Sequence, residues 1–255
     1  MNDAVLFEAR DDGIANITLN RPETRNALSK DVRQGLFSAW ERFESDVNLR
    51  VAILTGAGEK AFCAGGDLKE MVERGLTVPP RDMFPVPYDS IELSKPTIAA
   101  VNGVAFAGGW MIAQACDLCV ASTTAKFAVT EVKVGRSSPW ASPLIHMIPQ
   151  RIMMEILLTG KPITAHRAFE IGLINRVVEP EALMDAAILL ASAIIEGAPL
   201  SVRAARETVM LATEMGRSAA LEAARYASEL CYNSADAQEG PRAFSEKRKP
   251  KWQGR

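Results

Sequence analysis

The most apolar part of the chain, residues 97–122, places the tightest limit on the fold. It is long enough to span a membrane, but it contains Asn102, Gln114 and Asp117 together with three glycines. A membrane core leaves such polar groups without partners, so a strand, a glycine-rich turn and a helix inside a protein core fit better. We expect the strand at 97–101 and the helix at about 109–115.

A second unit of the same kind precedes this one. Residues 51–55 are typical of a short buried strand, and the later turn Ala64-Gly65-Gly66 leads to Asp67, a good N-cap for a helix that runs to about residue 75. Alternating residues at 5–9 and 14–19 predict a β-hairpin, and Ser29 begins a helix with apolar residues at helical spacing. Two strand–turn–helix units in series predict an α/β core with a partly parallel sheet.

Helical patterns dominate after about residue 150. They cover residues 151–158, 164–171, 181–195, 200–212 and 218–231. We therefore expect a core domain at 1–195 and a helical region at 196–255. The proline-rich stretch 79–87 is typical of a surface loop within the core.

Composition excludes several function classes. Hydrophobic residues make up 48% of the 255 residues, charged residues 24%, and the net charge is −2, which favours neither disorder nor a nucleic-acid partner. The four cysteines include one CxxC pair, Cys116 and Cys119, without the second pair of a zinc site, so we expect free thiols and no metal. The acidic N-terminal segment MNDAVLFEARDDG is unlike a signal peptide, which predicts a cytoplasmic protein without a membrane segment.

The two glycine-rich turns suggest a chemical site. Each turn ends at the start of a predicted helix, where backbone N–H groups lack partners and suit an oxygen that gains negative charge. A nucleotide loop is a poor alternative because the chain has no GxxxxGK[ST]. Either turn alone is explained as well by close packing, but the pair favours a site.

The chain resembles the enoyl-CoA hydratase/isomerase (crotonase) family over nearly all its length. The stretches that carry the resemblance are LNRPETRNAL, AFCAGGDLKEM, KPTIAAVNGVAFAGGWMIAQACDLCVAS, AKFAVTEVKVG, LLTGKPITAHRAFEIGLINRVV and EGPRAFSEKRKPKW. The resemblance implies a spiral of ββα repeats with a C-terminal helical trimerisation region, in a homotrimer or a dimer of trimers. It also implies an acyl-CoA substrate, with coenzyme A as part of the substrate and no separate cofactor.

The same resemblance assigns residues to roles. Gly66 and Gly108 are the expected oxyanion donors, and Glu131 is the expected acid/base. The residues expected to bind CoA are Arg25, Ala27, Ala64, Asp67, Leu68, Phe244 and Lys247. The last two match positions that reach the CoA of a neighbouring subunit, whereas without the resemblance EKRKPK is typical of a solvated basic tail.

The sequence departs from the family at one catalytic position. Family hydratases use two glutamates, and the first of them falls on Met111, whose thioether cannot transfer a proton. Adding water to C2=C3 is most simply done with two proton-transfer groups, whereas moving a double bond from C3 to C2 needs one base. Met111 therefore favours a one-base reaction, within the general class of enoyl-CoA hydratase or isomerase.

Other outcomes stay open at this point. A hydratase-lyase, a hydrolase or a decarboxylase acting on a bulky or aromatic acyl-CoA uses the same oxyanion hole. A non-catalytic acyl-CoA-binding or RNA-binding member is a different class, and the retained Glu131 argues against it. The expected substrate-pocket residues are Met111, Trp110, Arg136 and Trp140, of which Arg136 is able to pair with a substrate carboxylate. Asp117 is expected to be structural and His146 an ordinary core or interface residue.

Overall fold

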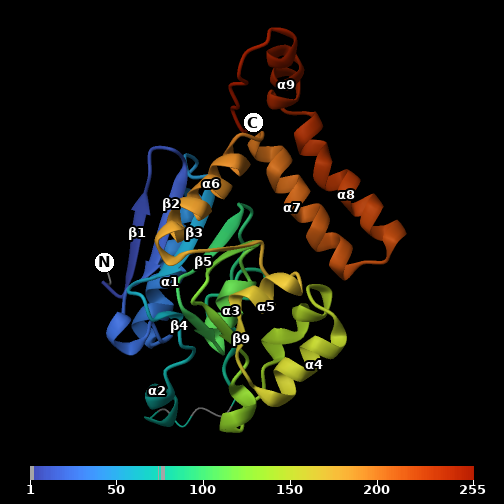
Figure 1. Ribbon diagram of the computed structural model, residues 1–255. Helices are drawn as coiled ribbons and strands as arrows, with labels where there is room; N and C mark the ends of the chain where they lie inside the picture. Colours follow the sequence, from blue (N-terminus) through green and yellow to red (C-terminus); the bar gives the residue numbers. More distant parts are fainter. Residues whose placement is uncertain (1–2, 74, 76–77) are drawn as a thin grey trace. The chain divides into compact units, whose positions relative to one another are not determined.

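The computed structural model describes residues 3–73, 75 and 78–255 (Figure 1). The chain divides into two compact units, one formed by Met1–Leu93 and Thr97–Ala191 and the other by Ser94–Pro96 and Ser192–Arg255. Within the described ranges, no single helix is long and apolar enough to cross a membrane.

A six-stranded sheet forms the centre of the first unit, with the order β1-β2-β3-β5-β7-β10. Its strands are β1 (Val5–Ala9), β2 (Ile14–Leu19), β3 (Val51–Gly56), β5 (Thr97–Val101), β7 (Leu118–Ser122) and β10 (Arg176–Val178). The predicted hairpin is confirmed, since β1 and β2 pair antiparallel, and the other four pairings are parallel. Every residue of β5 is buried, because a parallel strand is covered on both faces.

A second sheet of four short strands has the order β4-β6-β8-β9. These are β4 (Ala61–Cys63), β6 (Val104–Phe106), β8 (Lys126–Ala128) and β9 (Ile163–Thr164). The first three are parallel, and β9 runs antiparallel to β8. These strands were not predicted, because two or three residues are too few to show a periodic pattern.

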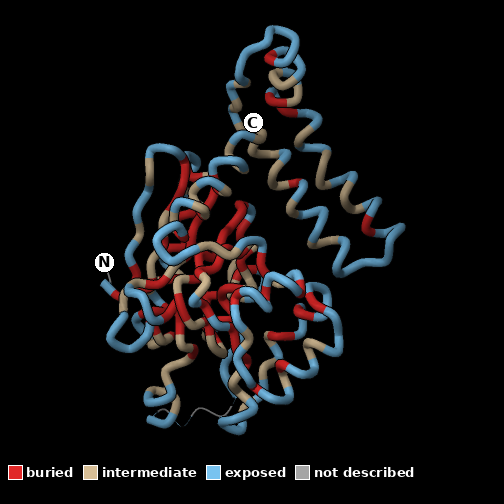
Figure 2. The backbone as a smooth tube through the Cα atoms, viewed as in Figure 1, coloured by how far each residue is buried: buried red, intermediate tan, exposed pale blue. Residues whose placement is uncertain are grey.

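Several helices of the first unit pack against these sheets. The helices of this unit are α1 (Lys30–Ser45), α2 (Leu68–Glu73), α3 (Gly108–Gln114), α4 (Gln150–Thr159), α5 (Ala165–Glu170) and α6 (Leu183–Ile195), whose last turn belongs to the second unit. The predicted caps of α1 and α2 are confirmed: Ser29 Oγ accepts the Val32 N–H, and Asp67 Oδ1 accepts two N–H groups of α2. The expected extension of α2 beyond Glu73 includes residue 74, which lies outside the described residues. Buried residues follow the strands and α3 (Figure 2).

Among its described residues, the first unit also contains five short 3-10 segments: η1 (Pro22–Thr24), η2 (Arg81–Met83), η3 (Glu131–Val134), η4 (Pro139–His146) and η5 (Pro180–Ala182). Two of them, η3 and η4, follow β8 and supply residues near the carboxyl end of that strand. The proline-rich stretch is not wholly a surface loop, because Pro85 and Pro87 are buried.

The second unit is helical. Helices α7 (Pro199–Glu214) and α8 (Arg217–Tyr232) pack against each other, and α9 (Asp236–Ser245) follows. Helix α9 was not predicted, since Gly240 and Pro241 within it are poor helix residues.

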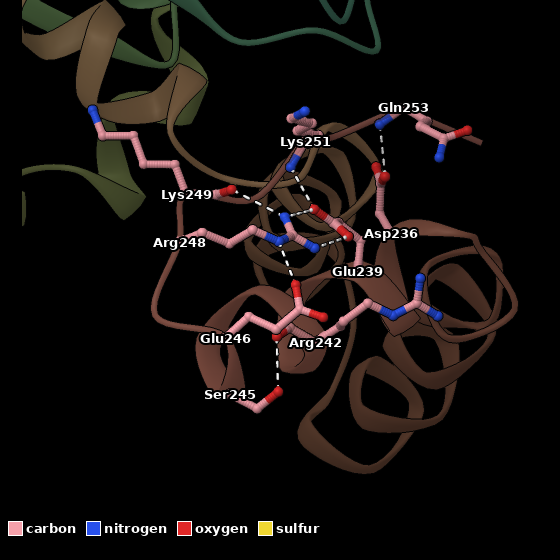
Figure 3. Close-up of polar contacts among 9 residues, drawn as sticks. All are labelled: Asp236, Glu239, Arg242, Ser245, Glu246, Arg248, Lys249, Lys251 and Gln253. Atoms are coloured by element: carbon pink, nitrogen blue, oxygen red, sulfur yellow. Dashed lines mark hydrogen bonds and ion pairs between the residues drawn. The ribbon is translucent and has the colours of Figure 1, made fainter.

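The C-terminal tail folds back onto α9 (Figure 3). Arg248 forms ion pairs with Glu239 at 2.6 Å and with Glu246 at 2.6 Å, and Glu239 also accepts the Lys251 N–H. The buried Asp236 accepts two further tail N–H groups, from residues 253 and 254. The basic segment is therefore partly ion-paired within its own unit, and is not simply a solvated tail.

Candidate active site

The three predicted catalytic residues follow three neighbouring parallel strands. Gly66 comes after β4, Gly108 after β6 and Glu131 after β8. The strands are paired side by side, with Cys63 beside Ala105. Because the carboxyl ends of parallel strands meet at one edge of the sheet, and neighbouring strands are about 4.8 Å apart, this topology brings the three positions together.

The two glycine-rich turns are in direct contact. A Cβ atom built on Gly109 would lie 2.1 Å from the carbonyl oxygen of Cys63, so α3 can begin this close to β4 only with glycine there. A Cβ atom built on Gly108 would lie 3.5 Å from the backbone nitrogen of Gly66. The backbones that carry the two predicted oxyanion donors are therefore adjacent.

Both turns use unusual backbone conformations. Gly65 has φ of 102°, and Ala107 has φ of 50° with ψ of −121°. The conformation of Ala107 is disfavoured for a residue with a Cβ atom and costs about 1–3 kcal/mol. Hydrogen bonds hold both turns: Ala107 N–H donates to the Ala128 carbonyl at 2.8 Å, and Leu28 N–H donates to the Gly65 carbonyl at 2.8 Å.

The turns leave two backbone donors unused. The first N–H groups of a helix have no acceptor within that helix, and Ala107 at the N-cap of α3 offers no side-chain acceptor. Within the described part of the chain, no hydrogen bond uses the N–H of Gly66 or that of Gly108.

Glu131 begins the η3 turn and has two chemically different carboxylate oxygens. The Trp140 indole N–H donates to Oε1 at 2.9 Å. Among the described residues, the buried Oε2 atom has no hydrogen-bond partner. Burial raises the pKa of this carboxyl group above its ordinary value, against the opposing effects of its own backbone N–H and of the Trp140 indole. A raised pKa suits a group that must both take up and return a proton near neutral pH.

The predicted pocket residues on α3 are buried. Met111 is 6% exposed and lies one turn after Gly108. Trp110 is 1% exposed and makes an edge contact with Phe127, with ring centroids 5.7 Å apart. That contact shows a packing role for Trp110, and its role in a substrate pocket stays a prediction.

Arg136 follows the η3 turn that Glu131 begins. The Arg136 N–H donates to the Glu131 carbonyl at 2.9 Å, and Arg136 is half-buried.

Asp117 is structural as expected, since it accepts from the N–H and Oγ1 of Thr97 and from the Tyr88 hydroxyl. His146 is exposed in this chain and is not a core residue.

Most of the residues expected to bind CoA lie around the first turn. The Ala64 N–H donates to the carbonyl of Arg25 at 3.0 Å, so the segment 25–28 runs beside Ala64-Gly65-Gly66. Ala27 is half-buried in that segment, and Leu68 is 55% exposed at the start of α2. Asp67 uses its carboxylate to cap α2.

The remaining two predicted CoA residues belong to the second unit. Phe244 is 87% exposed, and Lys247 is exposed with φ of 53°. A large exposed aromatic ring beside a lysine is consistent with a surface that contacts another molecule. The contact of these two residues with CoA stays a prediction.

Residues that were not predicted from the sequence support the first turn. Arg33 is 6% exposed, pairs with Glu70 of α2 at 2.8 Å and donates to the Leu28 carbonyl at 2.7 Å. The fully buried Asn26 accepts the Arg21 N–H and donates to the carbonyls of residues 57 and 61. A charged residue inside the apolar pattern of α1 was the available signal for Arg33.

Among the described residues, no cluster of three or more His, Cys, Asp or Glu side chains could hold a metal ion.

Comparisons with known proteins bear on this arrangement. The enoyl-CoA hydratase/isomerase family model matches residues 9–255. The chain is 40% identical to (E)-benzylidenesuccinyl-CoA hydratase of Thauera aromatica, covering 94% of this chain and 96% of that protein. It is also 40% identical to carnitinyl-CoA dehydratase of Citrobacter koseri, over the full length of both.

Solved structures agree with the sequence relatives. An enoyl-CoA hydratase from Mycobacterium tuberculosis H37Rv superposes with a TM-score of 0.91 at 39% identity, covering 99% of this chain and 100% of that one. The predicted crotonase-like α/β fold is thereby confirmed. The chain belongs to the enoyl-CoA hydratase/isomerase family and is an enzyme that transforms acyl-CoA thioesters.

Proposed function

We propose that this enzyme moves a proton at the carbon next to the thioester, with Glu131 as its single acid/base and the N–H groups of Gly66 and Gly108 as oxyanion donors. One observation carries the proposal. Glu131 follows β8, which pairs with β6, and among the described residues its buried Oε2 has no hydrogen-bond partner; the turn after β6 lies against the turn after β4, and each of these two turns holds one unused N–H donor. Met111 occupies the α3 position from which family hydratases supply a second carboxylate.

The favoured reaction is the isomerisation of a 3-enoyl-CoA to a 2-enoyl-CoA. Glu131 takes a proton from C2, and the C–H electron pair forms a dienolate whose negative charge lies on the thioester oxygen. The two backbone N–H groups stabilise that oxygen. Glu131 then returns the same proton to C4, which places the double bond between C2 and C3. No atom is gained or lost, so one carboxyl group suffices for both transfers.

The expected contributions are large enough to account for catalysis of this step. Removing one oxyanion donor typically costs a factor of about 10²–10³ in kcat. A positioned general base contributes a factor of about 10²–10⁴. Met111 contributes no proton transfer and shapes the pocket beside the reacting carbons.

A second candidate reaction is the addition or removal of water on a bulky, aromatic or charged acyl-CoA. The names of two relatives, a hydratase and a dehydratase at 40% identity, favour it. In that reaction Glu131 serves as base and acid in turn, and Arg136 pairs with a carboxylate on the acyl group. A lyase, hydrolase or decarboxylase reaction would use the same two N–H donors.

We further propose how the substrate is held. Arg25, Ala27, Ala64, Asp67 and Leu68 surround the CoA moiety. Phe244 and Lys247 contact the CoA of a neighbouring subunit in a homotrimer or a dimer of trimers. The helical region at 196–255 forms the subunit contacts. Trp110, Arg136 and Trp140 border the acyl pocket, and the enzyme works in the cytoplasm.

The test is hydrogen exchange at C2 of a saturated acyl-CoA in D₂O, followed by mass spectrometry. The wild type is expected to exchange C2 hydrogen, and Glu131→Gln to lose at least 100-fold in rate, because the amide cannot accept the proton. Glu41→Gln is the matched control, since Glu41 is an exposed residue of α1. Unchanged exchange in a folded Glu131→Gln variant would contradict the proposal.

A further inference from the structure

Trp140 contacts the predicted base directly and does so through its only polar atom. The indole N–H can donate one hydrogen bond and accept none, and it donates to Oε1 of Glu131 at 2.9 Å. The two residues lie on consecutive short segments, with Trp140 second in η4 and Glu131 first in η3. The indole N–H therefore already donates its one hydrogen bond to the Glu131 carboxylate, and it is not available to a substrate.

The position of Trp140 is itself held by α3. The side-chain amide of Gln114 donates to the Trp140 carbonyl at 2.7 Å. Gln114 lies three residues after Met111, close to one turn further along the same helix. The Trp140 side chain also packs against the buried core. Helix α3, which begins with the Gly108 donor, thus connects through Gln114 and Trp140 to the carboxylate of Glu131.

We propose that Trp140 is a positioning residue that anchors Oε1 of Glu131 and leaves Oε2 as the one oxygen that carries the proton. This inference rests on the proposed function of Glu131. The geometry separates the two oxygens: Oε1 is hydrogen-bonded, and Oε2 is buried without a partner among the described residues. A carboxylate that is free to rotate would present either oxygen, whereas an anchored one presents a single oxygen in a fixed orientation.

The anchor also bears on the charge state of the base. A hydrogen bond to an ionised carboxylate favours the charged form, so the indole lowers a pKa that burial raises. Other charged side chains lie near Glu131 in the chain or on a helix packed against its turn. Lys133 belongs to η3 and Arg136 follows it, and α4, which packs against η3, contains Arg151 and Glu155. The causes of the Glu131 shift are burial and hydrogen bonding. Loss of the indole N–H is therefore expected to raise the pKa of Glu131 further.

The first experiment measures the pH dependence of C2 exchange in Trp140→Phe. The acid limb of the profile is expected to move up by about one pH unit, the effect of a typical hydrogen bond to a charged group. The maximum rate is expected to fall about tenfold, and the Kd for a saturated acyl-CoA to stay within twofold. Trp252→Phe is the matched control, because its indole also donates one hydrogen bond, at 2.8 Å, to the Glu196 carbonyl of the second unit.

A second measurement needs no tryptophan substitution. The chain has four tryptophans, so the wild type gives four indole N–H resonances by NMR. The Trp140 resonance is expected to titrate with the same midpoint as the acid limb of C2 exchange and to stop titrating in Glu131→Gln. The Trp252 resonance serves as the internal reference.

The outcomes distinguish the anchoring role of Trp140 from the acid/base role of Glu131. An acid limb unchanged in folded Trp140→Phe, or a Trp140 resonance that does not follow Glu131, overturns the anchoring role and leaves the base in place. Should Trp140→Phe fail to fold, the NMR titration alone decides. Exchange that survives in Glu131→Gln overturns the proposed function itself.

Discussion

Replacing Gly109 by alanine tests whether the contact between the two glycine-rich turns sets up the site. The added Cβ would lie 2.1 Å from the Cys63 carbonyl oxygen, 2.8 Å from its carbonyl carbon and 3.0 Å from its Cβ. Non-bonded carbon atoms prefer separations of about 3.5–4.0 Å. The closest of these atoms belong to the backbone of β4 and cannot rotate away. Helix α3 must therefore move by about 1 Å or more relative to the first turn.

The size of the effect follows from that displacement. Inserting one methyl group into a tightly packed site costs about 1–3 kcal/mol of stability, which lowers Tm by about 2–12 °C for a chain of this size. Displacing a catalytic donor by about 1 Å costs roughly 100-fold in rate. We expect C2 exchange by Gly109→Ala to fall about 100-fold, far more than the fraction of unfolded protein can explain.

The assay compares C2 exchange per folded molecule with Tm from thermal unfolding. Gly216→Ala is the matched control, because Gly216 has φ of −64° and a Cβ there would have nothing within 4 Å. The control is expected to keep wild-type activity. A folded Gly109→Ala variant with exchange within twofold of the wild type would refute the role of the paired turns.

Three further predictions concern the support of the site and the tail. Asn26→Ala removes a side chain that makes three hydrogen bonds to the backbone and leaves their buried partners unpaired. The free energy of unfolding, measured in urea, is expected to fall by about 2–4 kcal/mol. A fall below about 1 kcal/mol would contradict this supporting role. Arg33→Met leaves Glu70 without its buried partner and is expected to lower the free energy of unfolding by about 3–5 kcal/mol. The double variant with Glu70→Met is expected to lose less than the sum of the two single variants. Strictly additive losses would show that the pair is not coupled. Arg248 lowers the pKa of Glu239 to about 2, so the contribution of this ion pair is complete above pH 4.5 and is lost as the pH falls from 4.5 to about 2. The protection factors of the backbone amides of residues 251–255, which correct the exchange rates for the intrinsic slowing of exchange at low pH, are expected to fall over that pH range, and a fall already above pH 5 would contradict the assignment.

Long elements of the first unit were predictable because their residues repeat a period. The hairpin alternates, β5 is continuously apolar, and Ser29 precedes a helix with apolar residues three and four apart. The strands β4, β6 and β8 have three residues each, too few for a period to show. These short strands bring Gly66, Gly108 and Glu131 to one sheet edge, so the geometry of the site depended on the part of the fold that the pattern did not predict.

Contacts between side chains were the other limit. Trp140 and Glu131 are nine residues apart, and neither their spacing nor their chemistry predicts a hydrogen bond between them. The Arg33–Glu70 pair spans 37 residues and depends on the placement of α2 beside the start of α1. The sequence did predict which residue types matter, because a methionine at position 111 already excludes proton transfer from that side chain.

Hydration of a short 2-enoyl-CoA by the wild type, Glu131→Gln and Met111→Glu shows whether Glu131 works without a second proton-transfer group. The wild type is expected to hydrate this substrate more slowly than it isomerises the matching 3-enoyl-CoA, and Met111→Glu is expected to raise the hydration rate by supplying the second carboxylate. Efficient hydration by the wild type that is abolished in Glu131→Gln and unchanged in Met111→Glu would contradict the single-base assignment.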